Sequence, residues 1–256
     1  MTGKFETVRR IVDDDDEIEG YLEAQNTTAV KRLGYNDHGR KHIGIVQERA
    51  LELLELLAGD SNHDGVGLGV EEHKKGLGYE DAKVVVYLAA TLHDVGHVVH
   101  RDRHPYYSVD LADGIVDRIL GEADVYTEKQ KIAVKGDVLH AILCHHTEES
   151  PLTAEAGIVR VADALDMEMG RSRLPYEKGR RGIDTVSSQA VKEVRLLDGR
   201  DEHGVPVLIE IDLRNSAGIY QVDSLLRSKV EDSGIKNQIR IVAVNEGDDI
   251  VGKIEF

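Results

Sequence analysis

Residues 84–97 read VVVYLAATLHDVGH, an apolar run that ends in a histidine and an aspartate. Its valine, leucine and alanine side chains leave no continuous polar face, which predicts a helix buried on most sides. We expect this helix to begin near Glu80 and to end at Gly96. It would carry His93 and Asp94 into whatever it packs against, so the fold is expected to form around it.

Further helices are predicted from apolar residues that repeat every three or four positions. Thr127 begins a capping-box pattern with Gln130, and Ser108 and Thr153 are the other expected N-caps. The lead-in 1–34 is expected to be peripheral, and its acidic run is interpreted as an exposed turn or helix start. With the buried helix, the predicted set is about 43–57, 80–96, 108–120, 127–146 and 153–166.

The pattern changes after residue 184, where apolar and polar residues alternate. Residues 191–196 and 207–213 predict a β-hairpin, and a helix at 219–230 and strands at 239–244 and 250–256 follow. We therefore expect a mainly α fold, with a helical domain over residues 1–183 and a small α/β domain over 184–256. About seventy residues are few for an independent core, so the tail is expected to dock on the helices or to pair with a second chain.

The composition excludes several classes of protein. The formal charge is −16, which would repel a phosphate backbone and disfavours general nucleic-acid binding. No apolar run is long enough to span a bilayer and the first residues lack a signal-peptide core, so we expect a cytoplasmic protein without a membrane partner. The single cysteine, Cys144, cannot form an internal disulfide and is expected to be buried.

The histidines carry the chemical signal. A single histidine on an apolar face is more often a hydrogen-bonded core residue, but here histidines and aspartates recur at the ends of several predicted helices. Such a set has no simpler common partner than divalent metal ions. Because His93 and Asp94 are neighbours in sequence, either the helix end is distorted or the carboxylate bridges two ions. The candidate ligands are His38, His42, His93, Asp94, His104, His145, His146 and Asp163.

These residues resemble the signature of the HD-domain metal-dependent phosphohydrolases, which is a histidine, a His-Asp pair and a distant aspartate on consecutive helices. The match is His42, His93-Asp94 and Asp163. His104-Pro105 and His145-His146 are similar to further ligands of the binuclear HD-GYP subgroup, and the resemblance covers residues 35–170.

The resemblance implies an HD-type helical bundle and a binuclear site. His42, His93, Asp94 and Asp163 would hold one ion, and Asp94 would bridge to a second ion held by His104, His145 and His146. His38 would be either a further ligand or a residue that supports one. Cyclic dinucleotide hydrolysis is not implied, because the Gly-Tyr-Pro segment is absent after His146 and His97 follows Gly96 where the subgroup has its lysine.

Metal chemistry of this kind supplies hydroxide near neutral pH and stabilises charge on a phosphoryl group. Histidine and carboxylate ligands without cysteine favour Mn, Fe, Co or Ni over a structural zinc. Arg101, Arg103, Arg171 and Arg173 are candidate contacts to a substrate phosphate, with a solvated loop as the alternative for the last two. His97 and His100 are candidate acids or phosphate donors, with a supporting or surface role as the alternative.

The sequence thus predicts a phosphohydrolase in which Asp94 and two divalent transition-metal ions cleave the ester of a nucleotide-like or other small phosphate. Two alternatives stay open, a diiron oxygenase of the same fold and a non-catalytic protein that binds nucleotides or mediates assembly. A homo-oligomer could form through an exposed strand edge of the C-terminal domain.

Overall fold

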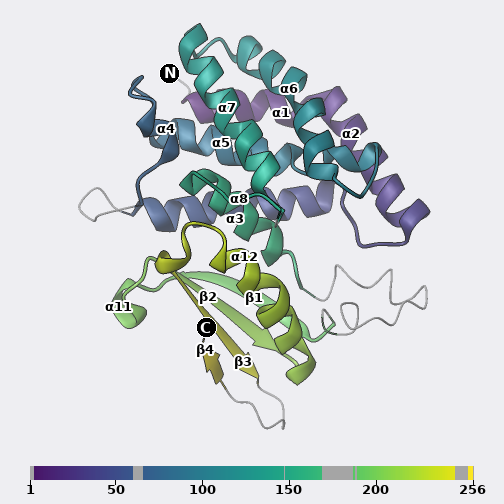
Figure 1. The fold of residues 1–256 in the computed structure, drawn as a ribbon, viewed down its shortest axis with the longest axis vertical. Helices are drawn as coiled ribbons and strands as arrows, with labels where there is room; N and C mark the ends of the chain where they lie inside the picture. Colours follow the sequence, from purple (N-terminus) through teal and green to yellow (C-terminus); the bar gives the residue numbers. More distant parts are fainter. Residues whose placement is uncertain are drawn as a thin grey trace.

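The computed structural model describes residues 3–59, 66–146, 148–168, 187, 189–245 and 253–255. Helices form one body, and a small sheet with its own helices lies against one side of it (Figure 1). The fold is therefore mainly α with a small α/β part, as predicted. The helices of the body are α1 (Lys4–Asp13), α2 (Asp16–Asn26), η1 (Thr27–Leu33), α3 (Arg40–Ala58), α4 (Gly69–Glu72), α5 (Tyr79–Leu92), η2 (Val95–Val98), α6 (His104–Ala123), α7 (Glu128–Cys144) and α8 (Ala154–Leu165).

Helix α5 is the centre of the body. Every residue from Asp81 to Leu92 except Lys83 is buried, as the unbroken apolar run predicts. The helix packs against α1, α3, α7 and α8, so its C-terminal end lies inside the protein. This end carries His93 and Asp94.

The N-terminal lead-in is part of this core, which corrects the expectation that it is peripheral. Phe5, Val8 and Val12 of α1 are buried, and the ring of Phe5 packs edge-on against Tyr87 of α5 at 5.5 Å. Asp15, from the acidic run, accepts a hydrogen bond from Ile18 and caps α2. The charged residues between the apolar ones hide this short amphipathic stripe in the sequence.

The helix boundaries follow the predicted caps in two cases out of three. Thr127 and Thr153 accept hydrogen bonds from backbone N–H groups three residues later and begin α7 and α8. Ser108 is not an N-cap, because α6 already begins at His104 with Pro105 in its first turn. The Ser108 hydroxyl instead accepts a hydrogen bond from Gly96 N–H at 2.8 Å.

The sheet has the order β1-β2-β3-β4, built from β1 (Val191–Asp198), β2 (Val207–Leu213), β3 (Ile239–Asn245) and β4 (Lys253–Glu255). The predicted hairpin is confirmed, with β1 antiparallel to β2, although a short helix, α11 (Arg200–His203), lies within its turn. β3 runs parallel to β2, so a crossover connects them. This crossover contains η3 (Ser216–Gly218), η4 (Gln221–Leu226), α12 (Arg227–Glu231) and η5 (Lys236–Gln238).

The C-terminal unit, residues 189–245, docks on the helical body. Arg49 of α3 donates a hydrogen bond to the Val194 carbonyl at 2.7 Å, and Arg200 donates one to the Leu56 carbonyl at 2.6 Å. Helix α12 packs against α8 (Figure 1). Docking on the helices is therefore the arrangement of this chain. The predicted domain boundary at 183/184 lies outside the described residues.

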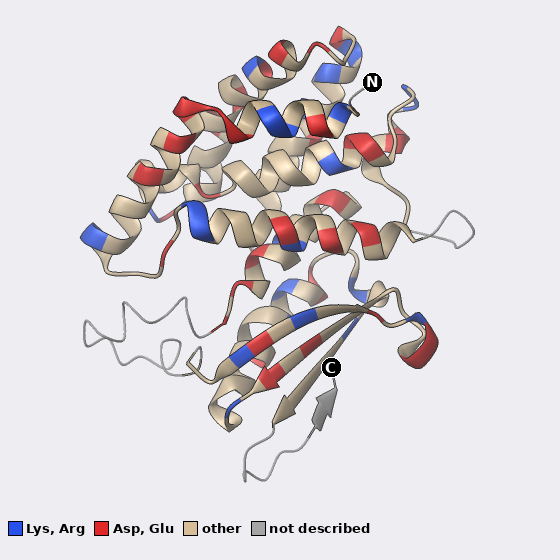
Figure 2. Cartoon of the chain, turned by 180° about the vertical axis from the view of Figure 1, so that it is seen from behind, with Lys and Arg blue, Asp and Glu red and all other residues tan. Residues whose placement is uncertain are grey.

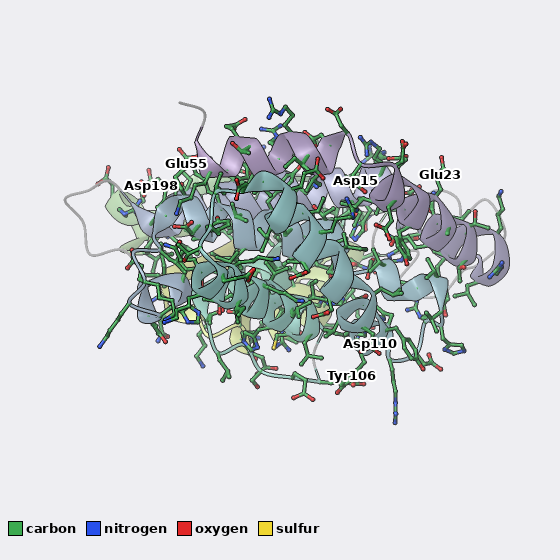
Figure 3. All side chains as sticks on the ribbon, turned by 90° about the horizontal axis from the view of Figure 1, so that it is seen from above. Asp15, Glu23, Glu55, Tyr106, Asp110 and Asp198 are labelled. Carbon is green, nitrogen blue, oxygen red and sulfur yellow. The ribbon has the colours of Figure 1, made fainter. Side chains whose placement is uncertain are left out.

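Charged residues of both signs are spread over helices and sheet (Figure 2). Among the labelled acidic residues, Glu55 and Asp198 lie at the end of the molecule opposite Glu23 (Figure 3). The negative charge is thus dispersed over the surface. Among the described helices, none combines the length and the apolar character that a membrane crossing requires.

Candidate metal centre

The His-Asp pair lies where α5 ends. His93 keeps helical backbone angles, but Asp94 departs from them at φ −103° and ψ 0°, and the tighter turn η2 begins at Val95. Gly96 lets α6 approach this turn, because a Cβ there would lie 2.2 Å from the His104 carbonyl oxygen. Of the two alternatives expected from the adjacency of the two residues, a change of helix geometry is therefore present at this point.

Four imidazoles around this turn share one orientation. Each is held from outside through Nδ1, which donates a hydrogen bond to a carbonyl or carboxylate oxygen, and each turns Nε2 inward. Such an outer bond fixes the tautomer whose Nε2 lone pair is free to bind a metal. The bonds join His42 to Asp166 at 2.6 Å, His93 to the Ala90 carbonyl at 2.9 Å, His104 to the Arg101 carbonyl at 2.9 Å and His145 to the Ile142 carbonyl at 2.6 Å.

The inward Nε2 atoms form two pairs. Those of His42 and His93 lie 3.3 Å apart, and those of His104 and His145 lie 3.0 Å apart. Asp94 stands between the pairs and turns one oxygen to each. Oδ2 lies 3.5 Å from both His42 and His93, whereas Oδ1 lies 3.2 Å from His104 and 3.8 Å from His145. Two facing lone pairs repel, so a proton or a metal ion between the nitrogens would stabilise each pair.

Asp163 of α8 completes the first pair. Its Oδ1 lies 3.5 Å from Nε2 of His42 and 3.7 Å from Nε2 of His93. Three overlapping groups of side chains in this region could each hold a metal ion, because within each group the ligand atoms lie within 4.8 Å of one another. Asp94 belongs to two of these groups. The three groups are His42, His93 and Asp94; His93, His145 and Asp163; and Asp94, His104 and His145.

His38 and His97 also contact Asp94 and form a fourth such group with it. Nδ1 of His38 donates to Oδ2 of Asp94 at 2.8 Å, and Nε2 of His97 lies 3.4 Å from Oδ1. His38 precedes α3, which begins at Arg40, so it lies outside the helix that carries His42. Asn26 holds this extended segment by accepting a hydrogen bond from His38 N–H at 3.2 Å.

His146 and His100 lie further out. The His146 ring is exposed, with its centroid 5.6 Å from that of His104, and it belongs to none of the four groups. His100 is exposed too, and its Nδ1 accepts a hydrogen bond from the Asp102 N–H at 3.0 Å. Neither ring therefore lies within the buried cluster.

Two of the four arginines that are candidate contacts to a substrate phosphate belong to the described residues. Arg101 and Arg103 are exposed on the loop that leads into His104, and the Arg101 guanidinium stacks on Tyr35 at 3.8 Å. The two residues are thus joined to the cluster through the backbone, since the Arg101 carbonyl accepts the hydrogen bond of His104. Arg171 and Arg173 lie outside the described residues.

Electrostatics favours ionised forms of the two carboxylates and the neutral form of one buried imidazole. Burial opposes ionisation of Asp94, but neighbouring imidazoles, those of His93 and His38 first, hold its pKa well below the usual range. Burial also opposes ionisation of Asp163, but the positive charge of Lys229 holds the pKa of this carboxyl well below its usual range. Burial itself keeps the pKa of His145 well below that of a free imidazole. Ionised carboxylates and neutral imidazole are the states that bind metal.

Sequence reasoning missed two residues of this region. Asp166 ends the predicted helix 153–166, but its role depends on His42, which lies 124 residues away in sequence. Lys229 of α12 donates to Asp163 Oδ2 at 2.6 Å, and no local pattern in the sequence connects these two residues. The donor set as a whole, with Nε2 atoms and carboxylate oxygens converging and no sulfur among them, fits divalent transition-metal ions.

Comparisons with known proteins agree with this geometry. The HD domain family model matches residues 48–168. The uncharacterized protein MJ1020 of Methanocaldococcus jannaschii is 39% identical over 226 residues, which cover 88% of this chain and 83% of that protein. No solved structure matches the chain significantly.

More distant similarity reaches bacterial ribonuclease Y. The protein from Roseiflexus sp. strain RS-1 is 26% identical over 63% of this chain, and that from Desulforudis audaxviator is 23% identical over 76%. The matches cover 29% and 38% of those proteins, so the chain spans about a third of their length. Members of the HD domain family bind divalent metals and are usually metal-dependent hydrolases. From the family match, its relatives and the arrangement of its histidines and aspartates, this chain belongs to the HD-domain superfamily.

Proposed function

We propose that the protein is a phosphohydrolase with two divalent metal ions that cleaves the ester of a nucleotide-like or other small phosphate. The observation that carries the proposal is the carboxylate of Asp94, which turns one oxygen to each pair of Nε2 atoms. A carboxylate can hold one metal with each oxygen, whereas an imidazole binds one. This arrangement supports two adjacent ions rather than one.

The proposed ligands follow from the same distances. His42, His93, Asp94 and Asp163 would hold the first ion, and Asp94, His104 and His145 the second. His146 is kept as an additional ligand of the second ion, and Mn, Fe, Co or Ni are the metals that suit these donors. Bound ions of this kind polarise a phosphoryl oxygen and lower the pKa of water toward neutrality.

The residues around the ligands have distinct proposed roles. His38 orients Asp94 through its hydrogen bond to Oδ2. His97 is buried, faces Asp94 with Nε2, and has no hydrogen-bond partner for Nδ1 among the described residues, so it is the imidazole best placed to exchange a proton with a bound substrate. Arg101 and Arg103 would bind the phosphate from the solvent side, and Arg171 and Arg173 remain further candidates for this role.

The class of substrate rests on two observations. The similarity to proteins named ribonuclease Y supports cleavage of a phosphate ester. The net charge of −16 disfavours a long polyanion and favours a small substrate.

The experiment measures hydrolysis of a generic phosphomonoester and a generic phosphodiester by metal-stripped protein refilled separately with Mn, Fe, Co, Ni or Mg. Asp94→Asn keeps the shape of the side chain but removes its charge, and turnover and bound metal are both expected to fall sharply. Asp110→Asn, on the exposed surface of α6 (Figure 3), is the matched control and should change neither. Two bound ions without turnover of either ester would contradict the hydrolase and direct attention to oxygen uptake by the iron form.

A further inference from the structure

One cation of the C-terminal unit enters the metal centre. Lys229 Nζ lies 2.6 Å from Oδ2 of Asp163 and 3.0 Å from the carbonyl oxygen of His145. Its side chain is 15% exposed, so these bonds are sheltered from solvent. Among the described residues, no other lysine or arginine forms an ion pair with Asp163 or Asp94.

The two oxygens of Asp163 have different partners. Oδ1 faces the Nε2 atoms of His42 and His93, and Oδ2 faces Lys229. A metal ion at the first pair would use Oδ1, so the ammonium and the ion do not compete for one oxygen. The ammonium instead fixes the rotation of the carboxylate that presents Oδ1 to the histidines.

Lys229 also joins two helices that carry proposed ligands. Asp163 is on α8, and His145 follows the end of α7. An ammonium has three donors, and here two of them hold these separate segments at a fixed spacing. One side chain thereby supports a proposed ligand of each ion.

The position of Lys229 is set by apolar packing around it. Val222, Leu226 and Val230 are buried at intervals of four along η4 and α12, which gives this crossover an apolar stripe. The segment after α12 approaches α8 closely, because a Cβ on Gly157 would lie 2.2 Å from the Ser233 carbonyl oxygen. None of these contacts involves the ammonium, so all of them remain when its charge is removed.

We propose that Lys229 is a positioning residue of the metal centre, so that the C-terminal unit completes the site of the helical domain. This inference rests on the metal centre of the proposed function, but not on the identity of the substrate. It gives the C-terminal unit a role beyond packing, because movement of α12 would release the carboxylate of Asp163.

The test measures Mn²⁺ binding to the metal-stripped, full-length protein. Lys229→Met keeps the aliphatic stem and removes the charge. Loss of a group that orients a metal ligand typically weakens binding about 10- to 100-fold, and we expect a loss of this size in the affinity for Mn²⁺. Lys229→Arg, which keeps the charge, should recover most of the affinity. Lys236→Met, at an exposed lysine of the same unit, should bind Mn²⁺ like the wild type.

Circular dichroism of each variant shows whether a loss of Mn²⁺ affinity comes from misfolding or from a displaced metal ligand. If Lys229→Met does not fold, the Mn²⁺ affinity of Lys229→Arg is the measurement that tests the inference. Unchanged Mn²⁺ affinity in folded Lys229→Met would overturn the inference. A raised KM with unchanged Mn²⁺ affinity would overturn it too, because Lys229 would then contact substrate. If Lys229→Met weakens metal binding while the wild type hydrolyses no ester, the inference stands and the proposed function fails.

Discussion

At the scale of single residues, the site depends on side chains that do not face its centre. Asp166 accepts the Nδ1 hydrogen of His42 at 2.6 Å and is buried. It thereby fixes which nitrogen of His42 turns inward. The inward-facing histidines could be predicted because their residue type and spacing are informative, whereas the position of Asp166 in a helix does not show which side chain it acts through.

We therefore expect Asp166→Ala to weaken metal binding without removing a ligand. The His42 ring loses the acceptor that holds its tautomer, which typically costs about 10- to 100-fold in affinity. Equilibrium dialysis with Mn²⁺ measures the change, and Asp166→Asn, which keeps an acceptor oxygen, should lie between Asp166→Ala and the wild type. Equal affinities for all three proteins would show that Asp166 does not orient His42.

The single thiol gives a second prediction at this scale. Cys144 is buried, and burial raises its pKa to about 11 from an ordinary value of 9.0. A pKa raised by about two leaves about 100-fold less thiolate at a given pH. This agrees with the prediction that Cys144 is a buried residue, and a buried thiol of this kind is a poor nucleophile. Native protein at pH 8 should react with iodoacetamide far more slowly than unfolded protein, as mass spectrometry can follow. Rapid labelling of the native form would contradict this.

The same shift has a consequence for stability. The folded state binds the thiol proton more tightly than the unfolded state, so the contribution of Cys144 to stability is complete below about pH 9 and is lost as the pH rises toward 11. Cys144→Ala should remove this part of the alkaline dependence in denaturant titrations. An unchanged pH profile in the variant would assign the dependence to other groups.

At the scale of elements, apolar periodicity located the helices but not all of their ends. The middle of α3 and of α5 could be predicted because buried residues recur at helical spacing. The start of α6 could not, since Ser108 has the right residue type for a cap and yet binds Gly96 across the chain. The lead-in allowed a helix, and its acidic run a helix start, but the burial of α1 and α2 was not predicted because charge interrupts their apolar stripe. Helix ends fixed by long-range contacts are not encoded locally.

Close packing of η2 on α6 gives a prediction at this scale. Gly96→Ala would place a Cβ 2.2 Å from the His104 carbonyl oxygen and 2.6 Å from Ser108 N, so the first turn of α6 must move. We expect a loss of about 1–3 kcal/mol in the free energy of unfolding, and weaker metal binding because His104 is in that turn.

Gly114→Ala is the matched control, because nothing lies within 4 Å of its added Cβ on the same helix. This variant should be stabilised by about 0.5–1 kcal/mol, the ordinary effect of replacing a helical glycine. Urea titration and Mn²⁺ binding measure both variants. Equal stability of the two proteins would show that Gly96 is not required for the approach of α6.

At the scale of the whole molecule, the relation between the two parts was the least predictable feature. The sequence indicated a small α/β unit that needs a partner surface, which could have been the helices or a second chain. Contacts such as Arg49 with the Val194 carbonyl select the helices. Self-association of the unit stays a prediction that light scattering can test. Lys229 belongs to this scale, because only the docked unit brings it to Asp163.

A double-mutant cycle tests whether docking and the metal centre are coupled. Gly157→Ala forces the Ser233 carbonyl away from α8 and should displace α12, which carries Lys229. If Gly157→Ala acts through Lys229, its effect on Mn²⁺ affinity should nearly vanish in the Lys229→Met background, because residues in one network are not additive. Gly136→Ala, on α7 with nothing within 4 Å of its added Cβ, should leave the affinity unchanged. Fully additive losses for Gly157→Ala and Lys229→Met would mean that α8 is perturbed directly, and that the docked unit does not control the site.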